Sequence, residues 1–118
     1  MVVPMKGKHY PSAREIRNMV YTSQIRFCNP YFWYKLNRRK ITIQEVDQAL
    51  LNCEIIEVLW KCKPLRILVN GYTAQGKPLH IAFSVVKPTE DTWWLDAITV
   101  YVPDPALWET PERRKKIA

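Results

Sequence analysis

The spacing of the apolar residues changes once along the chain, near residue 53, and this change constrains the fold more than any other feature. Up to Leu51 the apolar positions recur three or four residues apart, as on an amphipathic helix. From Glu54 onward they alternate and β-branched residues dominate, as in half-buried strands. Helices that precede the strands, instead of alternating with them, indicate an α+β fold. We expect N-terminal helices packed on one face of a four-stranded antiparallel sheet.

Capping signals place the helices. The signals are Ser12 with Glu15, Asn29 before Pro30, and Thr42 with Glu45. They predict helices over residues 13–20, 30–39 and 43–51. The expected strands are 54–61, 66–70, 78–86 and 93–101, joined by turns short enough for hairpins. Three prolines, Pro103, Pro105 and Pro111, are expected to end regular structure, and the tail after them to fray.

A length of 118 residues suits one domain. We divide it into a basic N-terminal extension with a short helix (1–23), a core (24–112) and a basic tail (113–118). No apolar run reaches the roughly 18 residues of a membrane helix, and the N-terminus lacks a signal-peptide core, so a cytoplasmic protein is expected. The three cysteines form no CxxC or CxxH pair, which predicts reduced, buried thiols. Neither a metal nor a cofactor is expected.

The net charge of +7 is unevenly distributed. Residues 1–40 carry nine basic residues and one acidic residue, a charge of +8, and residues 113–116 add +4. Residues 45–112 carry five basic and ten acidic residues, a charge of −5. The basic ends could form a phosphate-binding surface for a polyanion such as RNA, or a solvated surface that only aids solubility. The charge pattern leaves both alternatives open.

Alternation on the strands suggests one polar surface opposite the helices. In the fourth strand we expect Trp94, Asp96, Ile98 and Val100 on one face and Trp93, Leu95, Ala97, Thr99 and Tyr101 on the other. If the hairpins align them, a concave surface is lined by Arg66, His80, Ser84, Thr99 and Tyr101. On such a surface His80 could act as general acid or base on RNA, with Arg66 or Arg39 stabilising charge on phosphorus. The alternative, which spacing alone favours, is that His80 is a half-buried strand residue hydrogen-bonded to a neighbour.

The second helix interleaves aromatic and basic residues. Tyr31–Tyr34 is four aromatic residues in succession, followed by Arg38, Arg39 and Lys40. Such interleaving is typical of proteins that bind single-stranded nucleic acid. Helical geometry favours core positions for Phe32 and Trp33 and leaves Tyr31 and Tyr34 open between packing and stacking.

Three segments resemble a known family. The small bacterial domain of unknown function numbered 4258, itself similar to the RelE-like and BrnT-like toxin ribonucleases, has the pattern HAxxRMxxRxIT, then PLH, then ITVYxPDPxxW. The corresponding segments here are Tyr31–Thr42, Pro78–His80 and Ile98–Trp108, and the match covers about residues 24–114. Tyr31 stands where the family has histidine, and Lys35 where it has arginine.

The resemblance implies an α+β fold with a four-stranded antiparallel sheet and a toxin-type ribonuclease that cuts RNA by metal-free transesterification. In that hypothesis His80 is the acid or base, Arg39 and Lys35 hold the phosphate, and Tyr31 and Tyr101 position it. The expected substrate-binding residues are Arg66, Arg38, Ser84 and Thr99. The second hypothesis is an inactive module of the same fold that binds RNA or a protein, and the replacement at Tyr31 favours it. An antitoxin, another protein or a second copy of the chain are further possible partners; no membrane contact is expected.

Overall fold

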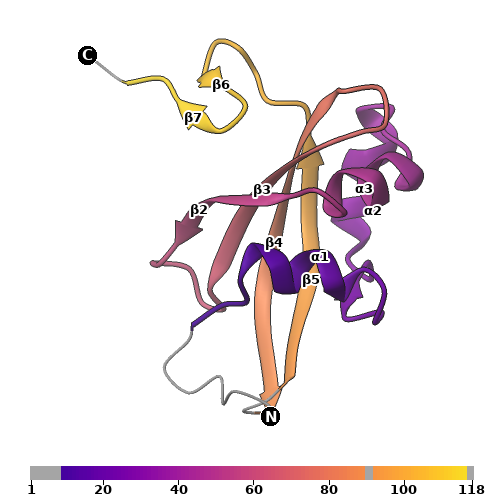
Figure 1. Cartoon of the computed structure of the whole chain (residues 1–118), viewed down its shortest axis with the longest axis vertical. Coiled ribbons are helices and arrows are strands. Elements are labelled where there is room, and N and C mark those ends of the chain that lie inside the picture. The colour runs from indigo at the N-terminus through magenta and orange to yellow at the C-terminus, as the bar shows by residue number, and fades with distance from the viewer. Residues whose placement is uncertain (1–8, 90–91, 117–118) are drawn as a thin grey trace.

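The computed structural model describes residues 9–89 and 92–116 and shows an α+β fold with three helices (Figure 1). The helices are α1 (Ala13–Met19), α2 (Pro30–Arg38) and α3 (Ile43–Leu50). Each begins where its capping signal predicts: both capping boxes form, and the Asn29 side chain accepts from the backbone N–H of Tyr31. The three predicted helices are confirmed. They could be predicted because capping depends only on residues within one turn.

The main sheet has five strands in the order β1-β5-β4-β3-β2. Their bounds are β1 (Ile25–Arg26), β2 (Glu54–Leu59), β3 (Arg66–Tyr72), β4 (Pro78–Thr89) and β5 (Thr92–Tyr101). Strands β2 to β5 form the expected antiparallel meander. The expectation of four antiparallel strands was incomplete, because β1 adds a fifth strand that is parallel to β5. The sheet is therefore mixed.

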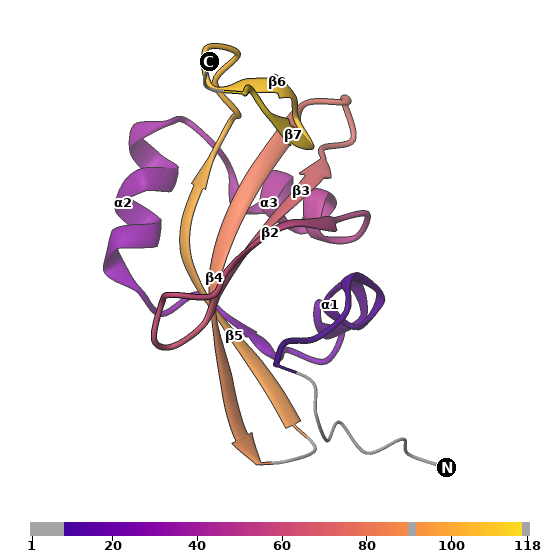
Figure 2. The same ribbon diagram turned by 90° about the vertical axis from the view of Figure 1, so that its left-hand side faces the viewer.

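The core lies between the helices and one face of this sheet. The helices contribute Ile16, Phe32, Leu36, Val46 and Leu50, and the sheet contributes Ile67, Val69, Ile81, Phe83 and Leu95. In Figure 2, α2 lies beside the β5 side of the sheet and α3 lies behind it. The other face of the sheet, on which alternate residues such as Ser84 lie, is here called the open face.

A β-bulge in β5 changes which residues lie on the open face. Phe83 pairs with Ala97 and Ala82 with Thr99, so Ile98 is the extra residue. Beyond it the alternation is shifted by one. Val100 is therefore buried in the core, and the expectation that it shares a face with Asp96 was wrong. The expectation that Thr99 and Tyr101 share a face with Trp93, Leu95 and Ala97 was wrong for the same reason.

The C-terminal segment forms a hairpin, which corrects the expectation of an irregular, frayed tail. Strands β6 (Trp108–Thr110) and β7 (Arg113–Arg114) pair antiparallel, and the backbone N–H of Lys115 donates to the carbonyl of Leu107. The prolines lie before and between these strands, where no ladder hydrogen bond is required of them. In Figure 2 this C-terminal hairpin lies at the upper end of the sheet.

The remaining expectations concern the cysteines, a membrane-spanning helix and the segments at the ends of the chain. Of the three cysteines, all of them free thiols, only Cys53 is buried, so the expectation of buried thiols was wrong for Cys28 and Cys62. No helix within residues 9–89 and 92–116 is long and apolar enough to cross a membrane. Parts of the proposed extension (1–8), third turn (90–91) and tail (117–118) lie outside the described residues.

Candidate functional site

The open face brings five of the predicted site residues together in rows across the strands. His80 on β4 pairs with Tyr101 on β5 and with Asn70 on β3. Two rows further along, Ser84 pairs with Arg66 and with Asp96. Thr99 pairs with Ala82 in the row between them. The hairpin alignment expected from the sequence is thus observed, with the bulge at Ile98 placing Thr99 and Tyr101 on this face.

His80 is fully buried on the open face, beneath the C-terminal hairpin. Its Nε2 lies 2.6 Å from the carbonyl oxygen of Pro111, so Nε2 carries the proton and donates. Its Nδ1 lies 3.4 Å from the Tyr101 hydroxyl, and the Trp108 ring stands edge-on at 4.4 Å. Burial lowers the pKa of His80, although the Pro111 carbonyl and two nearby glutamates oppose this shift. The imidazole is neutral at physiological pH and no substrate reaches it in this arrangement.

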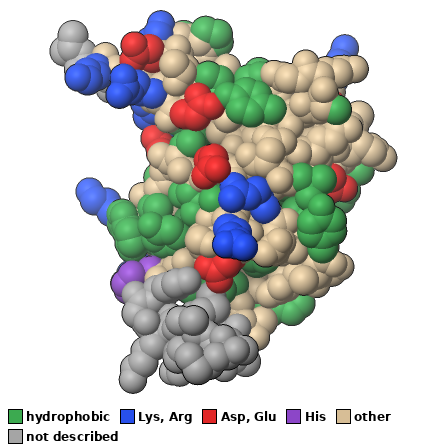
Figure 3. Space-filling view, in the orientation of Figure 1, with side chains coloured by type: hydrophobic (Ala, Val, Ile, Leu, Met, Phe, Trp, Pro, Cys, Tyr) green, Lys and Arg blue, Asp and Glu red, His purple; other side chains and the backbone are tan. Residues whose placement is uncertain are grey.

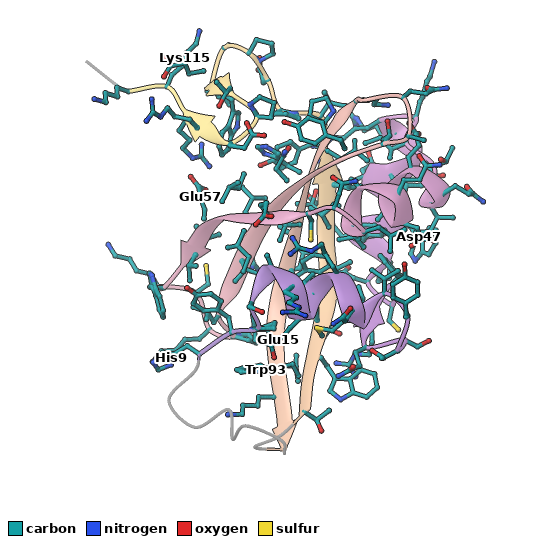
Figure 4. The ribbon with its side chains drawn as sticks, in the orientation of Figure 1. His9, Glu15, Asp47, Glu57, Trp93 and Lys115 are labelled. Atoms are coloured by element: carbon teal, nitrogen blue, oxygen red, sulfur yellow. The ribbon has the colours of Figure 1, made fainter. Side chains whose placement is uncertain are left out.

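Further contacts hold the hairpin on the sheet. Glu112 accepts from the Tyr72 hydroxyl and, at 3.4 Å, from the Asn70 amide. Arg114 forms a two-pronged ion pair with Glu57 of β2, and its guanidinium lies 4.5 Å from the centre of the Trp108 ring. Figure 4 shows Glu57 on β2 below this hairpin. Because these contacts are spread over β2, β3 and β4, the hairpin is anchored across the sheet.

Arg39 connects helix α2 to the open face. It caps the C-terminus of α2, and its Nη1 donates to the Val100 carbonyl at 2.7 Å and to the Thr99 hydroxyl at 3.2 Å. The guanidinium lies 5.7 Å from the centre of the Tyr101 ring. Arg39, Thr99, Tyr101 and His80 are therefore contiguous. Within the described residues, Arg39 has no carboxylate partner, so its charge is available to an anion.

The remaining predicted catalytic residues lie along α2, away from His80. Tyr31, Lys35 and Arg39 follow one another at four-residue intervals, and eight residues of helix place Tyr31 about 12 Å from Arg39 along the axis. The Lys35 ammonium lies 5.0 Å from the Tyr31 ring and 5.9 Å from the Tyr34 ring. The structure therefore separates the five residues into two groups, with Arg39 adjacent to both.

Of the four aromatic residues of helix α2, only Phe32 is buried. Tyr31 is 49% exposed and Tyr34 is 54% exposed, whereas Phe32 is fully buried, as expected. Trp33 is also exposed, at 38%, so its expected core position was wrong; its Nε1 donates to the Phe27 carbonyl at 2.6 Å. The Arg38 guanidinium donates to the Tyr34 hydroxyl at 2.9 Å. We call the surface formed by Tyr31, Tyr34, Arg38 and Arg39, which are exposed, and Lys35, which is half-buried, the α2 stripe.

Two residues that the sequence analysis did not select lie on the open face beside Ser84. Arg26 of β1 donates to both carboxylate oxygens of Asp96, at 2.6 and 3.0 Å, and its guanidinium lies 5.4 Å from the centre of the Trp94 ring. No local signal could have found this pair, because it depends on a parallel contact between segments 70 residues apart. Arg66 of β3 is exposed and unpaired within the described part of the chain.

Basic side chains also gather over the C-terminal hairpin, at the upper left of Figure 3. They belong to residues 113–116, all of which are exposed. No group of three or more His, Cys, Asp or Glu side chains in the described residues could hold a metal ion.

Comparison with known proteins gives no relative: no family model, no curated protein and no solved structure matches this chain.

Proposed function

We propose that this protein binds single-stranded RNA through the α2 stripe. The observation that carries the proposal is the exposure of Tyr31 and Tyr34 among cations that have no carboxylate partner in the described residues. Exposed tyrosine rings offer stacking surfaces to bases, and each stacked base contributes about 1–3 kcal/mol. Lysine and arginine beside them neutralise phosphates and release counterions. Stacking surfaces and cations are interleaved along one face of the helix, and the bases and phosphates of a single RNA strand alternate in the same way.

The burial of His80 favours binding over cleavage. A general acid or base must come within hydrogen-bond reach of the proton that it transfers. Here both imidazole nitrogens are engaged by the protein and the ring has no exposed area. The proposed activity is therefore retention of RNA without turnover while the C-terminal hairpin is in place.

Ribonuclease activity of the RelE-like type is the second candidate. It is favoured by one observation, the contiguity of His80, Tyr101, Thr99 and Arg39. Such a set supplies an acid or base, a phosphate ligand and a positioning hydroxyl. This second candidate includes membership of the family of unknown function numbered 4258. It also includes an antitoxin as the protein partner.

The test compares tyrosines in two environments. Tyr31→Ala and Tyr34→Ala are each expected to weaken binding to a labelled single-stranded RNA by about tenfold, since each removes a stacking surface. Tyr21→Ala is the matched control, because Tyr21 is 77% exposed but lies outside the α2 stripe. Equal affinity in all three variants and the wild type would refute the proposal.

The same RNA, incubated with the protein in EDTA and analysed on a gel, separates the two candidates. Intact RNA that is retained by the protein supports binding alone. Cleavage that is lost in His80→Ala, a variant checked for folding by circular dichroism, supports the ribonuclease. Cleavage that persists in that variant excludes His80 as its acid or base.

A further inference from the structure

A pocket of about 370 Å³ opens on the open face at the N-terminal end of α2. Its lining residues come from β1 and the loop after it, from β4 and from β5: Arg26, Cys28, Asn29, Ser84, Asp96 and Ile98. Asn29 is also the N-cap of α2, so the pocket lies at the end of the α2 stripe nearest Tyr31. We call it the Arg26–Asp96 pocket.

The ion pair between Arg26 and Asp96 gives this pocket a donor, the guanidinium, and an acceptor, the carboxylate, in fixed positions. Arg26 uses Nε and Nη2 on the two oxygens of Asp96, which holds the carboxylate and the guanidinium in one plane. Its Nη1 has no hydrogen-bond partner in the part of the chain that the structure describes. Each carboxylate oxygen retains lone-pair capacity, because an ionised carboxylate accepts up to about four hydrogen bonds. Donor and acceptor are therefore presented side by side.

Two further side chains offer unused hydrogen-bonding capacity. The Ser84 hydroxyl has no partner within the described residues. The Oδ1 of Asn29 is engaged by the Tyr31 N–H, which leaves its amide NH₂ as an unused donor. Ile98 adds apolar surface. The lining thus combines one carboxylate, several neutral or cationic donors and an apolar contact.

This combination selects among ligands by chemistry. A phosphate is disfavoured because the Asp96 carboxylate would repel it, and an apolar ligand would leave the polar groups unsatisfied. A planar base fits when it carries donors for the carboxylate and, next to them, acceptors for the guanidinium. Among RNA bases, guanine presents two N–H groups beside O6 and N7, whereas adenine and cytosine lack a ring N–H donor and uracil offers a single one.

We propose that the Arg26–Asp96 pocket binds a guanine base of the RNA that lies along α2. The proposal rests on the proposed function for the presence of RNA. It adds a base preference, whereas the α2 stripe contacts only phosphates and the faces of bases, which do not distinguish one base from another. Asp96 accepts from the guanine N1–H and N2–H, and Arg26, Ser84 and Asn29 donate to O6 and N7.

The test measures binding of GMP, AMP, CMP and UMP to the whole chain by NMR titration. GMP is expected to bind about tenfold more tightly than each of the other three, the usual size of a good two-point base contact. Ser84→Leu narrows the pocket and is expected to abolish this difference. Val86→Leu is the matched control, because Val86 lies on the same face of β4 but does not line the pocket. Asp96→Asn is expected to lose the difference as well.

Equal binding of the four nucleotides, no binding of any, or a GMP preference that survives Ser84→Leu would each overturn the proposal. The failure of the proposed function gives a different pattern. If the pocket discriminates GMP while Tyr31→Ala and Tyr34→Ala leave RNA affinity unchanged, the guanine site stands and the α2 stripe fails. If an RNA of adenosines alone binds through the stripe and GMP is not preferred, only the pocket proposal fails.

Discussion

At the scale of single residues, His80 joins the sheet to the C-terminal hairpin. One ring nitrogen donates to the Pro111 carbonyl and the other faces the Tyr101 hydroxyl, so the neutral imidazole satisfies a partner on each side. Protonation of the imidazole would turn Nδ1 into a second donor and place a positive charge in a site without solvent, which is unfavourable. In this arrangement His80 therefore has a structural role, and the contacts around it favour the neutral imidazole.

The depressed pKa of His80 predicts that stability falls as the pH is lowered. In the unfolded chain the imidazole titrates near 6.5, whereas burial lowers the pKa of His80 in the folded chain. Below about pH 6.5 the unfolded state binds more protons than the folded state, so unfolding is favoured progressively until the folded pKa is passed. Urea midpoints from tryptophan fluorescence at pH 7.5 and pH 5.5 measure this loss.

His80→Gln is the control, because glutamine can still donate to Pro111 but does not titrate. Its midpoint should change less between the two pH values than that of the wild type. An equal change in both proteins would show that other groups cause the pH dependence.

Gly71 of strand β3 lies close against the backbone of helix α3 at Ala49. A Cβ at this position would stand 1.9 Å from the Ala49 carbonyl oxygen, a backbone atom that cannot rotate away. Gly71→Ala is expected to destabilise the fold by about 3 kcal/mol or more, since the helix or the strand must shift. Gly76→Ala provides the comparison: its φ of +82° is strained for alanine, but nothing lies within 4 Å. Chemical denaturation should show the larger loss for Gly71→Ala, and the reverse order would contradict this account.

At the scale of elements, local signals were sufficient for the helices and distant contacts decided the rest. Ser12 and Glu15 lie within one turn, so their capping box could be predicted from spacing alone. The two-residue strand β1 exists only because it meets β5, and the bulge at Ile98 depends on how β5 aligns with β4. The sequence pattern near such positions is compatible with several registers.

The candidate site divides in the same way. The exposed, basic and aromatic character of α2 could be predicted from helical geometry, although the exposure of Tyr31 and Tyr34 required the structure. The covering of His80 could not be predicted, because it is produced by a hairpin about thirty residues further along the chain. The prolines around Trp108 indicated loop structure, and tertiary contacts with the sheet overrode that local preference.

Trp108 is expected to be the side chain that holds the C-terminal hairpin on the sheet. It is 5% exposed and contacts both His80 and the Arg114 guanidinium. Trp108→Ala should cost about 3–5 kcal/mol of stability, as for other buried tryptophans, and should expose His80 to solvent. The pKa of His80 should then rise toward its ordinary value, because the burial that lowers it is lost.

An NMR titration of the His80 ring, in a His9→Gln background so that one histidine remains, measures this pKa. Leu107→Ala is the matched control within the same segment, since Leu107 is 57% exposed. A pKa that stays depressed in Trp108→Ala would show that the hairpin does not depend on this ring. The same variant also tests the second functional candidate, because uncovering His80 should raise any RNA cleavage.

At the scale of the whole molecule, the charge is segregated. Four of the described acidic residues in the middle of the chain form ion pairs: Glu45 with Lys77, Glu54 with Arg17, Asp96 with Arg26 and Glu57 with Arg114. The cations of α2 have no such partner in the described residues, and neither does Arg66. Part of the net charge of +7 therefore lies on α2 and at Arg66, where no carboxylate of the described residues neutralises it.

This segregation predicts the salt dependence of RNA binding. If Lys35, Arg38, Arg39, Lys40 and Arg66 each contact one phosphate, the logarithm of the association constant should fall with the logarithm of the salt concentration with a slope of about −3.5, at about 0.7 per phosphate on a single strand. Fluorescence anisotropy with labelled RNA between 50 and ~300 mM salt measures the slope. Arg38→Ala should reduce its magnitude by about 0.7. Arg14→Ala, an exposed cation on α1, should leave it unchanged. A slope near zero, or an equal reduction in both variants, would show that the excess charge serves solubility and not RNA binding.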